Sequence, residues 1–158
     1  MQTHNVAQIN IGRLIAPLDD PRIERFVSQL GPINELADNS PGFVWRLQSE
    51  QGNATNLAYN DDPSIMVNMS VWVSIEALKE FTYKSQHLGV FRERSRWFQK
   101  MELPHYCLWW VPVGHIPTVE EGRVKLEHYQ RYGSTAESFW FSEPQPVPQV
   151  DLEPVLLT

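Results

Sequence analysis

Ser64-Ile-Met-Val-Asn-Met-Ser-Val-Trp-Val73 is the stretch of sequence that decides the fold. Its β-branched and aromatic residues favour a strand, and apolar and polar side chains alternate along it. Such alternation places successive side chains on opposite faces of a sheet. One face carries Val67, Met69, Val71 and Val73, and the other carries Asn68, Ser70 and Trp72.

Three further stretches are predicted to be strands of the same sheet. Residues 6–13 and 43–49 alternate between apolar and polar side chains, whereas residues 106–111 form a short, strongly apolar run. The apolar set on the alternating strands is Ile9, Ile11, Phe43, Trp45 and Leu47, and the polar set is Gln8, Asn10, Arg46 and Gln48.

Helical segments are predicted between and after these strands. Asp20 followed by Pro21 is typical of a helix start, and Gly31-Pro32 is predicted to kink or break the helix that follows. Ser74 is predicted to cap a second helix, which is interrupted near residues 85–89 and continues through residues 91–98. Residues 118–121, Thr-Val-Glu-Glu, form a capping box that opens a late helix.

The order strand, helix, strand, strand, helix, strand is that of the ferredoxin-like βαββαβ arrangement, an α+β fold with an antiparallel sheet and helices on one face. We expect the apolar face of the sheet to pack against these helices. The polar face then needs a cover, which a second copy of the chain would supply in a homodimer. Each polar group buried there without a partner costs on the order of 1–3 kcal/mol, so this face is either hydrogen-bonded or the lining of a ligand cavity.

Length and composition fit one soluble domain. The 158 residues are predicted to form one domain over residues 1–142, followed by a proline-rich arm over residues 143–158. A formal net charge of −6 argues against nucleic acid as a partner. Neither a signal peptide nor a membrane span is predicted, so we expect a cytoplasmic protein without a membrane partner. The single cysteine, Cys107, lies in an apolar run and is expected to be buried and unreactive.

A set of segments spread along the chain carries a family resemblance. They are Asn10-Ile-Gly-Arg13, Ser40-Pro-Gly-Phe-Val-Trp-Arg46, Val67-Asn-Met-Ser-Val-Trp72, Ser85-Gln-His87, Arg94-Ser-Arg-Trp-Phe98, Trp109-Trp110 and Gly114-His-Ile-Pro-Thr-Val-Glu-Glu121. Together they resemble an uncharacterised family, domain of unknown function 3291, over nearly the whole chain up to about Phe141.

That family looks like a branch of the dimeric α/β-barrel superfamily. Members of the superfamily include antibiotic-biosynthesis monooxygenases, haem-degrading monooxygenases, muconolactone isomerases and polyketide cyclases. The resemblance implies a ferredoxin-like chain that pairs as a homodimer into a dimeric α/β barrel. A fold shared by so many chemistries does not by itself name one of them.

Haem-degrading relatives use an Asn on the first strand, a Trp on the helix after the third strand and a His further along that helix as the iron ligand. Asn10 and His87 match this pattern, but Phe81 stands in the place of the helical Trp and Trp72 lies on the strand instead. This departure argues against haem degradation. No cofactor is therefore predicted, with haem as the alternative, and no metal site is predicted because no Cys and His set has zinc spacing.

The predicted catalytic residues are His87, Asn10 and Arg46. His87 is either an acid or base, or a ligand of haem or a metal, or else a structural cap or surface histidine. Arg46 either holds a carboxylate or enolate through its planar fork, or forms an ion pair across the dimer. The predicted ligand-binding residues are Asn68, Ser70, Trp72, Arg94 and Trp109.

Each of these ligand-binding predictions has a structural alternative. The amides and the hydroxyl either orient a substrate carbonyl or satisfy one another. Trp72 either stacks on an aromatic ligand or packs in the core. Arg94 either meets an anionic ligand or belongs to a solvated helix face.

The sequence carries no nucleophile elbow, Walker loop, dinucleotide fingerprint or paired-carboxylate signature. The remaining chemistry needs a shaped cavity, hydrogen-bond donors and one histidine: proton transfer, isomerisation or cyclisation, or cofactor-independent oxygenation. The leading hypothesis is a small-molecule enzyme of the monooxygenase, isomerase or cyclase-like dimeric barrel group, acting on an aromatic or polyketide-like compound. The alternatives are a non-catalytic protein that binds haem or another hydrophobic ligand, and a structural or regulatory homodimer.

Overall fold

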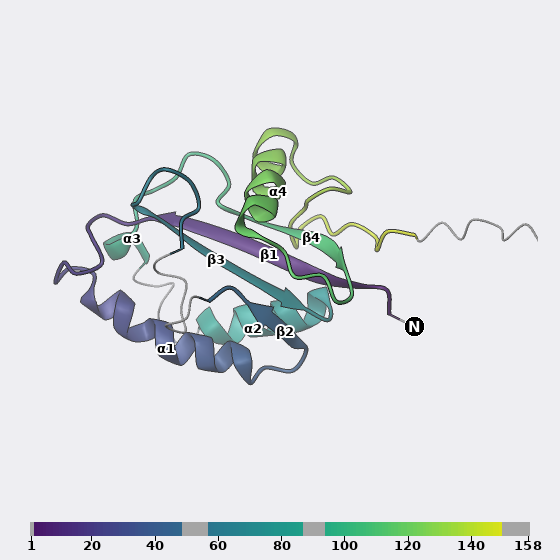
Figure 1. Ribbon diagram of the computed structural model, residues 1–158, viewed down its shortest axis with the longest axis horizontal. Helices are drawn as coiled ribbons and strands as arrows, with labels where there is room; N and C mark the ends of the chain where they lie inside the picture. The colour runs from purple at the N-terminus through teal and green to yellow at the C-terminus, as the bar shows by residue number, and fades with distance from the viewer. Residues whose placement is uncertain (1, 49–56, 87–93, 150–158) are drawn as a thin grey trace, which may run out of the picture.

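The computed structural model describes residues 2–48, 57–86 and 94–149 (Figure 1). Within these ranges the strands are β1 (His4–Arg13), β2 (Phe43–Arg46), β3 (Ile65–Trp72) and β4 (Tyr106–Pro112). The helices are α1 (Glu24–Asp38), α2 (Ile75–Gln86), α3 (Arg94–Trp97) and α4 (Val119–Tyr132). None of these helices is both long enough and apolar enough to cross a bilayer.

The four strands form one antiparallel sheet in the order β2-β3-β1-β4. The central strand β1 lies between β3 and β4, so that Ile9 pairs with Met69 on one side and with Cys107 on the other. Helix α1 connects β1 to β2, and α2 and α3 lie between β3 and β4. The predicted ferredoxin-like βαββαβ arrangement is therefore confirmed, and the predicted homodimer stays a prediction.

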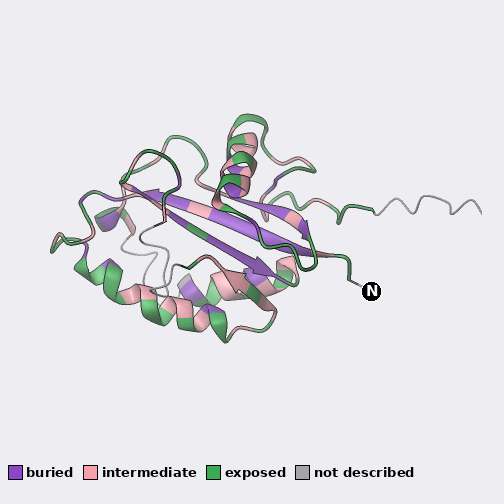
Figure 2. Ribbon diagram, viewed as in Figure 1, coloured by how far each residue is buried: buried purple, intermediate pink, exposed green. Residues whose placement is uncertain are grey.

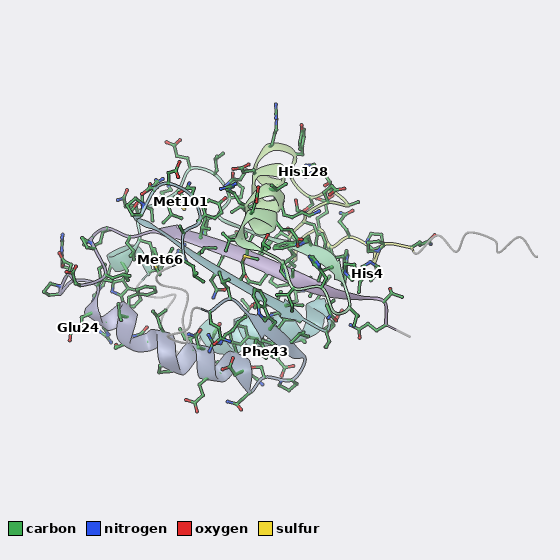
Figure 3. All side chains as sticks on the ribbon, in the orientation of Figure 1. His4, Glu24, Phe43, Met66, Met101 and His128 are labelled. Atoms are coloured by element: carbon green, nitrogen blue, oxygen red, sulfur yellow. The ribbon has the colours of Figure 1, made fainter. Side chains whose placement is uncertain are left out.

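Different helices cover the two faces of this sheet, with α1 and α2 on one side and α4 on the other (Figure 1). Glu24, at the start of α1, and His128, on α4, lie at opposite sides of the molecule (Figure 3). Helix α4 approaches the apolar face closely, because a Cβ atom at Gly122 would lie 2.9 Å from Ile9 Cδ1 and 3.1 Å from Met69 Sδ. The glycine lets the helix backbone come near the sheet.

The predicted orientation of the sheet is consequently wrong. The sequence placed the apolar face against the helices of the βαββαβ unit, whereas α1 and α2 cover the polar face and α4 covers the apolar one. Alternation identifies which side chains share a face but not which helix covers them. The late helix, which follows the βαββαβ unit, supplies the apolar cover that was expected from the earlier helices.

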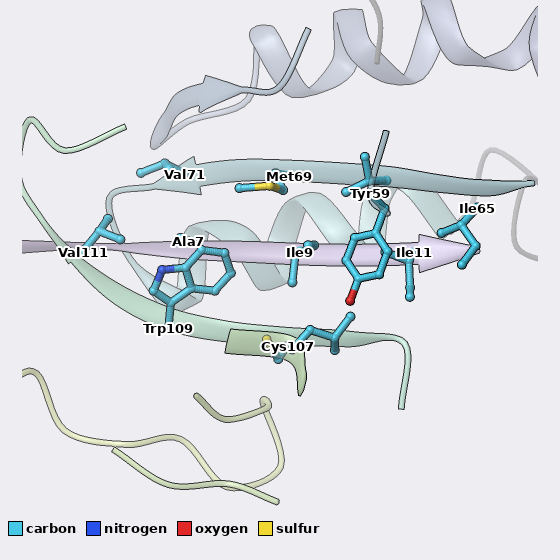
Figure 4. Close-up of a cluster of buried hydrophobic side chains, with 12 residues drawn as sticks. Ala7, Ile9, Ile11, Tyr59, Ile65, Met69, Val71, Cys107, Trp109 and Val111 are labelled. Atoms are coloured by element: carbon cyan, nitrogen blue, oxygen red, sulfur yellow. The ribbon is translucent and has the colours of Figure 1, made fainter. Parts of the chain in front are cut away.

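The main core lies between the apolar sheet face and α4, and Figure 4 shows its side chains on the strands. Leu126 of α4 is fully buried there, and burial raises the pKa of Tyr59 at its edge to about 12. Cys107 is a buried free thiol, as expected. The buried members of this cluster are Ala7, Ile9, Ile11, Tyr59, Ile65, Val67, Met69, Val71, Cys107, Trp109, Val111 and Leu126.

A β-bulge makes β2 change face. The register shifts between Phe43, which pairs with Trp72, and Trp45, which pairs with Val71. Phe43 packs edge-on against Trp72 with ring centroids 5.5 Å apart, whereas Trp45 packs against the core under α4. The prediction that Phe43 shares a face with Trp45 and Leu47 is wrong, because the bulge inserts one residue into the alternation.

Two helix boundaries also differ from the prediction. Helix α1 begins at Glu24, after a turn in which Asp20 Oδ1 accepts a hydrogen bond from the Arg22 backbone N–H at 2.9 Å. It continues through Pro32 to Asp38 without the predicted break. Most of this helix is exposed or half-buried (Figure 2), so water can satisfy the carbonyl that the proline leaves unpaired.

Helix α4 begins at its predicted residue. Thr118 Oγ1 accepts a hydrogen bond from the Glu121 backbone N–H at 3.1 Å, and Gly133, with φ of 72°, follows the last turn. The reciprocal half of the capping box is replaced. The Glu121 carboxylate instead accepts a hydrogen bond from Trp109 Nε1 at 3.0 Å and lies 2.7 Å from His115 Nε2.

The segment after α4 lies along the outer edge of β4. The backbones of Leu108 and Phe139 exchange two hydrogen bonds, of 2.8 and 2.9 Å. Trp110 Nε1 donates a hydrogen bond to the backbone carbonyl of Gln145, in the predicted proline-rich arm. This segment shields an edge that would otherwise expose unpaired backbone groups, and it carries Trp140 and Phe141 to the side of α1 and α2.

Candidate functional site

A cavity of about 520 Å³ lies between the polar face of the sheet and helices α1 and α2. Volumes of roughly 300–1,000 Å³ are typical of small-molecule sites. Helix α1 buries only Phe26 and Ala37 against the rest of the molecule, which fits a helix that stands over a cavity and not over a packed core. The polar face of the sheet is thus the floor of this cavity and α1 and α2 are its roof.

The walls of the cavity are largely aliphatic and aromatic. Helix α1 contributes apolar side chains from four positions, α2 contributes two, and the segment after α4 adds two aromatic rings at the β4 edge. Trp140 lies against Tyr106, with ring centroids 3.9 Å apart. The apolar lining residues are Phe26, Leu30, Ile33, Ala37, Leu78, Phe81, Phe98, Leu108, Trp140 and Phe141.

The floor of the cavity is a network of amides and a hydroxyl from β1 and β3. Gln8 Nε2 donates hydrogen bonds to Asn68 Oδ1 at 2.7 Å and to Ser70 Oγ at 2.8 Å. Asn10 Nδ2 donates to Gln8 Oε1 at 3.0 Å and to Asn68 Oδ1 at 3.1 Å. Trp72 Nε1 also donates to Ser70 Oγ, at 2.8 Å. These bonds use every N–H donor of the Gln8 and Asn10 amides.

Two polar groups of this network remain open to the cavity. Asn68 is the exposed member, and neither N–H of its Nδ2 has a hydrogen-bond acceptor among the described residues. Asn10 Oδ1 likewise accepts no hydrogen bond from them. The network therefore fixes the orientation of the Asn68 amide and leaves its donors available to an oxygen atom of a ligand.

Arg46 reaches the cavity because the bulge in β2 brings it opposite Ser70 on the polar face. Its Nε donates to Asp38 Oδ1 at 2.8 Å and its Nη2 donates to Asp38 Oδ2 at 3.3 Å. This bidentate pair joins β2 to the last residue of α1 within one chain. The predicted alternative of an ion pair across the dimer does not describe this contact.

His105, directly before β4, lines the cavity and was not among the predicted site residues. Burial first, and then the positive charge of Arg94, lower the pKa of His105 below its usual 6.5. A neutral imidazole at neutral pH can accept a proton. The signal in the sequence was its position directly before an apolar strand, where a side chain lies at the rim of the sheet.

Arg94, the first residue of α3, also lines the cavity. Its Nη2 donates a long hydrogen bond of 3.4 Å to the Ile11 carbonyl, and its Cζ lies 4.9 Å from the centroid of the Phe98 ring. Burial lowers the pKa of the Arg94 guanidinium, though it remains charged at neutral pH. Arg94 and His105 are thus the cationic and the basic group at one end of the cavity.

Several predicted site residues are brought together and others are not. Asn10, Arg46, Asn68, Ser70 and Arg94 all line the cavity. Trp72 does not, because it is fully buried and stacks on Phe81 with ring centroids 4.9 Å apart.

The other two predictions fall elsewhere. Trp109 lies in the core on the opposite face of the sheet, under α4, because its position in β4 points away from the polar floor. His87 lies outside the described residues. Among those that are described, no group of three or more His, Cys, Asp and Glu side chains is placed to hold a metal ion.

Comparison with solved structures gives distant likenesses. SnoaB, a cofactor-independent oxygenase from Streptomyces nogalater, is 13% identical with a TM-score of 0.44, over 71% of this chain and 95% of that one. A Nitrosomonas europaea protein, provisionally assigned as an antibiotic biosynthesis monooxygenase, is 16% identical with a TM-score of 0.45, over 73% and 94%. A protein of unknown function from Nitrosomonas europaea is 9% identical with a TM-score of 0.46, over 75% and 97%. Likenesses this distant say nothing about activity or substrate.

Sequence comparison identifies the family. No curated protein matches the chain significantly. The profile of the family described as Domain of unknown function (DUF3291) matches residues 5–154, which is nearly the whole sequence and includes every described residue that lines the cavity. The predicted resemblance is thereby confirmed, and the chain belongs to the DUF3291 family.

Proposed function

We propose that this protein is an enzyme that binds a flat aromatic or polyketide-like compound in the cavity and transforms it by proton transfer. The reaction is of the isomerase, cyclase or cofactor-independent monooxygenase type. One observation carries the proposal: Gln8 and Asn10 hold the Asn68 carbonyl oxygen through two hydrogen bonds, while the Asn68 N–H donors, unpaired among the described residues, are open to a cavity of ligand size.

The shape and chemistry of the cavity support an aromatic ligand. Ten of the described side chains that line it are apolar, including rings from Phe26, Phe81 and Trp140. Ring faces and edges of this kind favour flat apolar ligands. The Asn68 donors would bind an oxygen of the ligand and fix its orientation on the floor.

The groups around this oxygen suit proton abstraction from the ligand. His105 takes a proton from a carbon next to a carbonyl; the C–H electron pair forms a C=C bond, and the carbonyl π electrons move to the oxygen as an enolate. The Asn68 N–H groups stabilise the negative oxygen. Return of the proton to another atom gives isomerisation, attack on a second carbonyl gives cyclisation, and reaction of the enolate with O₂ gives oxygenation.

Binding is tested with a pair of ligands that differ in one oxygen. Calorimetric titration with 2-naphthol and with naphthalene should show tighter binding of 2-naphthol by the wild-type protein. Asn68→Asp replaces the N–H donors with an acceptor and should abolish the difference. Asn60→Asp makes the same charge change at an exposed loop position and should preserve it. Equal binding of both compounds by the wild type would count against the proposal.

Proton transfer is tested with 2-tetralone, an aromatic ketone with exchangeable protons next to its carbonyl. The wild-type protein should accelerate the exchange of these protons for deuterium, followed by NMR. His105→Gln should lower the acceleration by on the order of 100-fold, the contribution of a general base. Binding of 2-tetralone without faster exchange would leave a ligand-binding protein and refute the catalytic part of the proposal.

A further inference from the structure

Charged side chains are distributed unevenly between the cavity and the rest of the molecule. The chain has 19 acidic and 13 basic residues, with a formal net charge of −6. The described residues that line the cavity nevertheless include two arginines, Arg46 and Arg94, and neither Asp nor Glu. The described lining of the cavity thus carries positive charge, although the protein as a whole is acidic.

The two arginines differ in how their charge is balanced. Arg46 is neutralised by the bidentate contact with Asp38. Arg94 has no carboxylate partner within the described ranges, where its contacts are the Ile11 carbonyl and the Phe98 ring. Other arginines, such as Arg13 and Arg22, pair with aspartates. Of the two arginines in the cavity, Arg94 is therefore the one whose positive charge no described carboxylate balances.

An uncompensated guanidinium is costly where water is partly excluded. Charges removed from water are normally paired or coordinated, because their desolvation is not otherwise offset. Arg94 is half-buried beside His105, and one weak hydrogen bond to a backbone carbonyl leaves most of its N–H donors unused. An acidic chain has many carboxylates that could have filled this role. Their absence from the described lining leaves the position open for an anion from outside.

We infer that the natural ligand is an anion, and that Arg94 binds its negatively charged oxygen. The inference rests on the proposed function and narrows it to one class of compound, aromatic molecules that carry a carboxylate or an ionised phenol or enol. The planar fork of arginine fits a carboxylate through two parallel hydrogen bonds and an enolate through one. Asn68 then contacts a second oxygen of the same ligand or shares the first.

The test compares 2-naphthoate with 2-naphthamide, which has the same ring and nearly the same shape but no charge. Calorimetric titration at neutral pH should show that the wild-type protein binds the naphthoate about ten-fold more tightly, or more, as expected for a charge-assisted hydrogen bond. Arg94→Gln should lower naphthoate affinity to that of the amide. Arg94→Lys, which keeps the charge but not the fork, should retain part of the preference.

Arg131→Gln is the matched control, because it removes the same charge from an exposed residue of α4 on the other side of the sheet. It should keep the wild-type preference. Equal binding of naphthoate and naphthamide would overturn the inference and leave the proposed aromatic site in place. A preference that survives Arg94→Gln in a folded variant would also overturn it. Failure to bind either compound would refute the proposed function together with the inference.

Discussion

The corner between α1 and β2 fixes how the roof of the cavity is placed, and Gly42→Ala should destabilise it strongly. Gly42 has φ of 82°, and a Cβ there would lie 2.6 Å from Ala77 Cβ and 2.8 Å from Val73 Cγ2. Val73 can rotate its methyl group away. Ala77 cannot, because its Cβ is attached directly to the backbone of α2, so the helix itself must move.

Two costs add at this position. The left-handed conformation costs a residue with a Cβ roughly 1–2 kcal/mol. Overpacking against α2 costs about 1–3 kcal/mol more. Gly42→Ala should therefore lower the free energy of unfolding by about 2–5 kcal/mol.

Urea denaturation of the full chain measures this free energy, and two other glycines separate its causes. Gly114 has φ of 90°, but a Cβ there would have no neighbouring atom within 4 Å, so Gly114→Ala should cost only the conformational part. Gly31, in α1, has neither a positive φ nor a close neighbour. Gly31→Ala should raise stability by up to about 1 kcal/mol through helix propensity. If Gly42→Ala costs no more than Gly114→Ala, the close contact of α1, β2 and α2 at this corner is refuted.

Four further predictions test the site and its surroundings. The pKa of His105 is lowered, so its imidazole is neutral at neutral pH. The rate of proton exchange of 2-tetralone should therefore rise with pH and reach its plateau before pH 6.5. Stability should fall as the pH drops through 6.5 towards the lower folded pKa, because the unfolded chain then binds the proton more readily, and His105→Gln should remove this part of the pH dependence. Cys107 is buried, which raises the pKa of its thiol, so a thiol reagent should label it in denaturant and not in the native state. Trp109→Phe loses one hydrogen bond in the core under α4 and should cost about 1 kcal/mol in urea denaturation; a changed affinity for 2-naphthol would show that the two faces are not independent. Native mass spectrometry should give twice the 18.3 kDa mass of the chain if the predicted homodimer forms, and Arg46→Gln should leave that mass unchanged because Arg46 pairs with Asp38 of its own chain.

Sequence patterns predicted the strands and the polar face of the sheet well, because both depend on local alternation. Gln8, Asn10, Asn68 and Ser70 were assigned to one face from period alone, and pairing between β1 and β3 brings them together. The ferredoxin-like arrangement followed from the order of elements along the chain. Alternation along a strand and the order of elements are properties that a residue and its near neighbours in the sequence determine.

The parts that the sequence did not predict depend on contacts between distant segments. Nothing local shows that α4 takes the apolar face, since that choice depends on the fit of Gly122 against Ile9 and Met69. The bulge between Phe43 and Trp45 changes which side chains of β2 share a face, and the alternation along residues 43–49 gives no sign of it. Trp140 reaches the cavity only because the segment after α4 runs back along the β4 edge.

The two faces of the sheet have different roles, which explains how a polar floor is tolerated beneath α1 and α2. Burial of apolar side chains supplies most of the driving force for folding, and here the face under α4 supplies it, with Ile9, Met69 and Leu126 fully buried. Helix α1 therefore does not need to pack closely against the sheet, and it buries only Phe26 and Ala37. If the polar face served only to hold the fold, all its amide groups would be paired with one another, as the N–H donors and the carbonyl oxygen of Gln8 are. Among the described residues, the Asn68 donors have no acceptor and the Arg94 charge has no carboxylate partner, and neither group then serves the fold. A ligand oxygen that accepts from both would account for them.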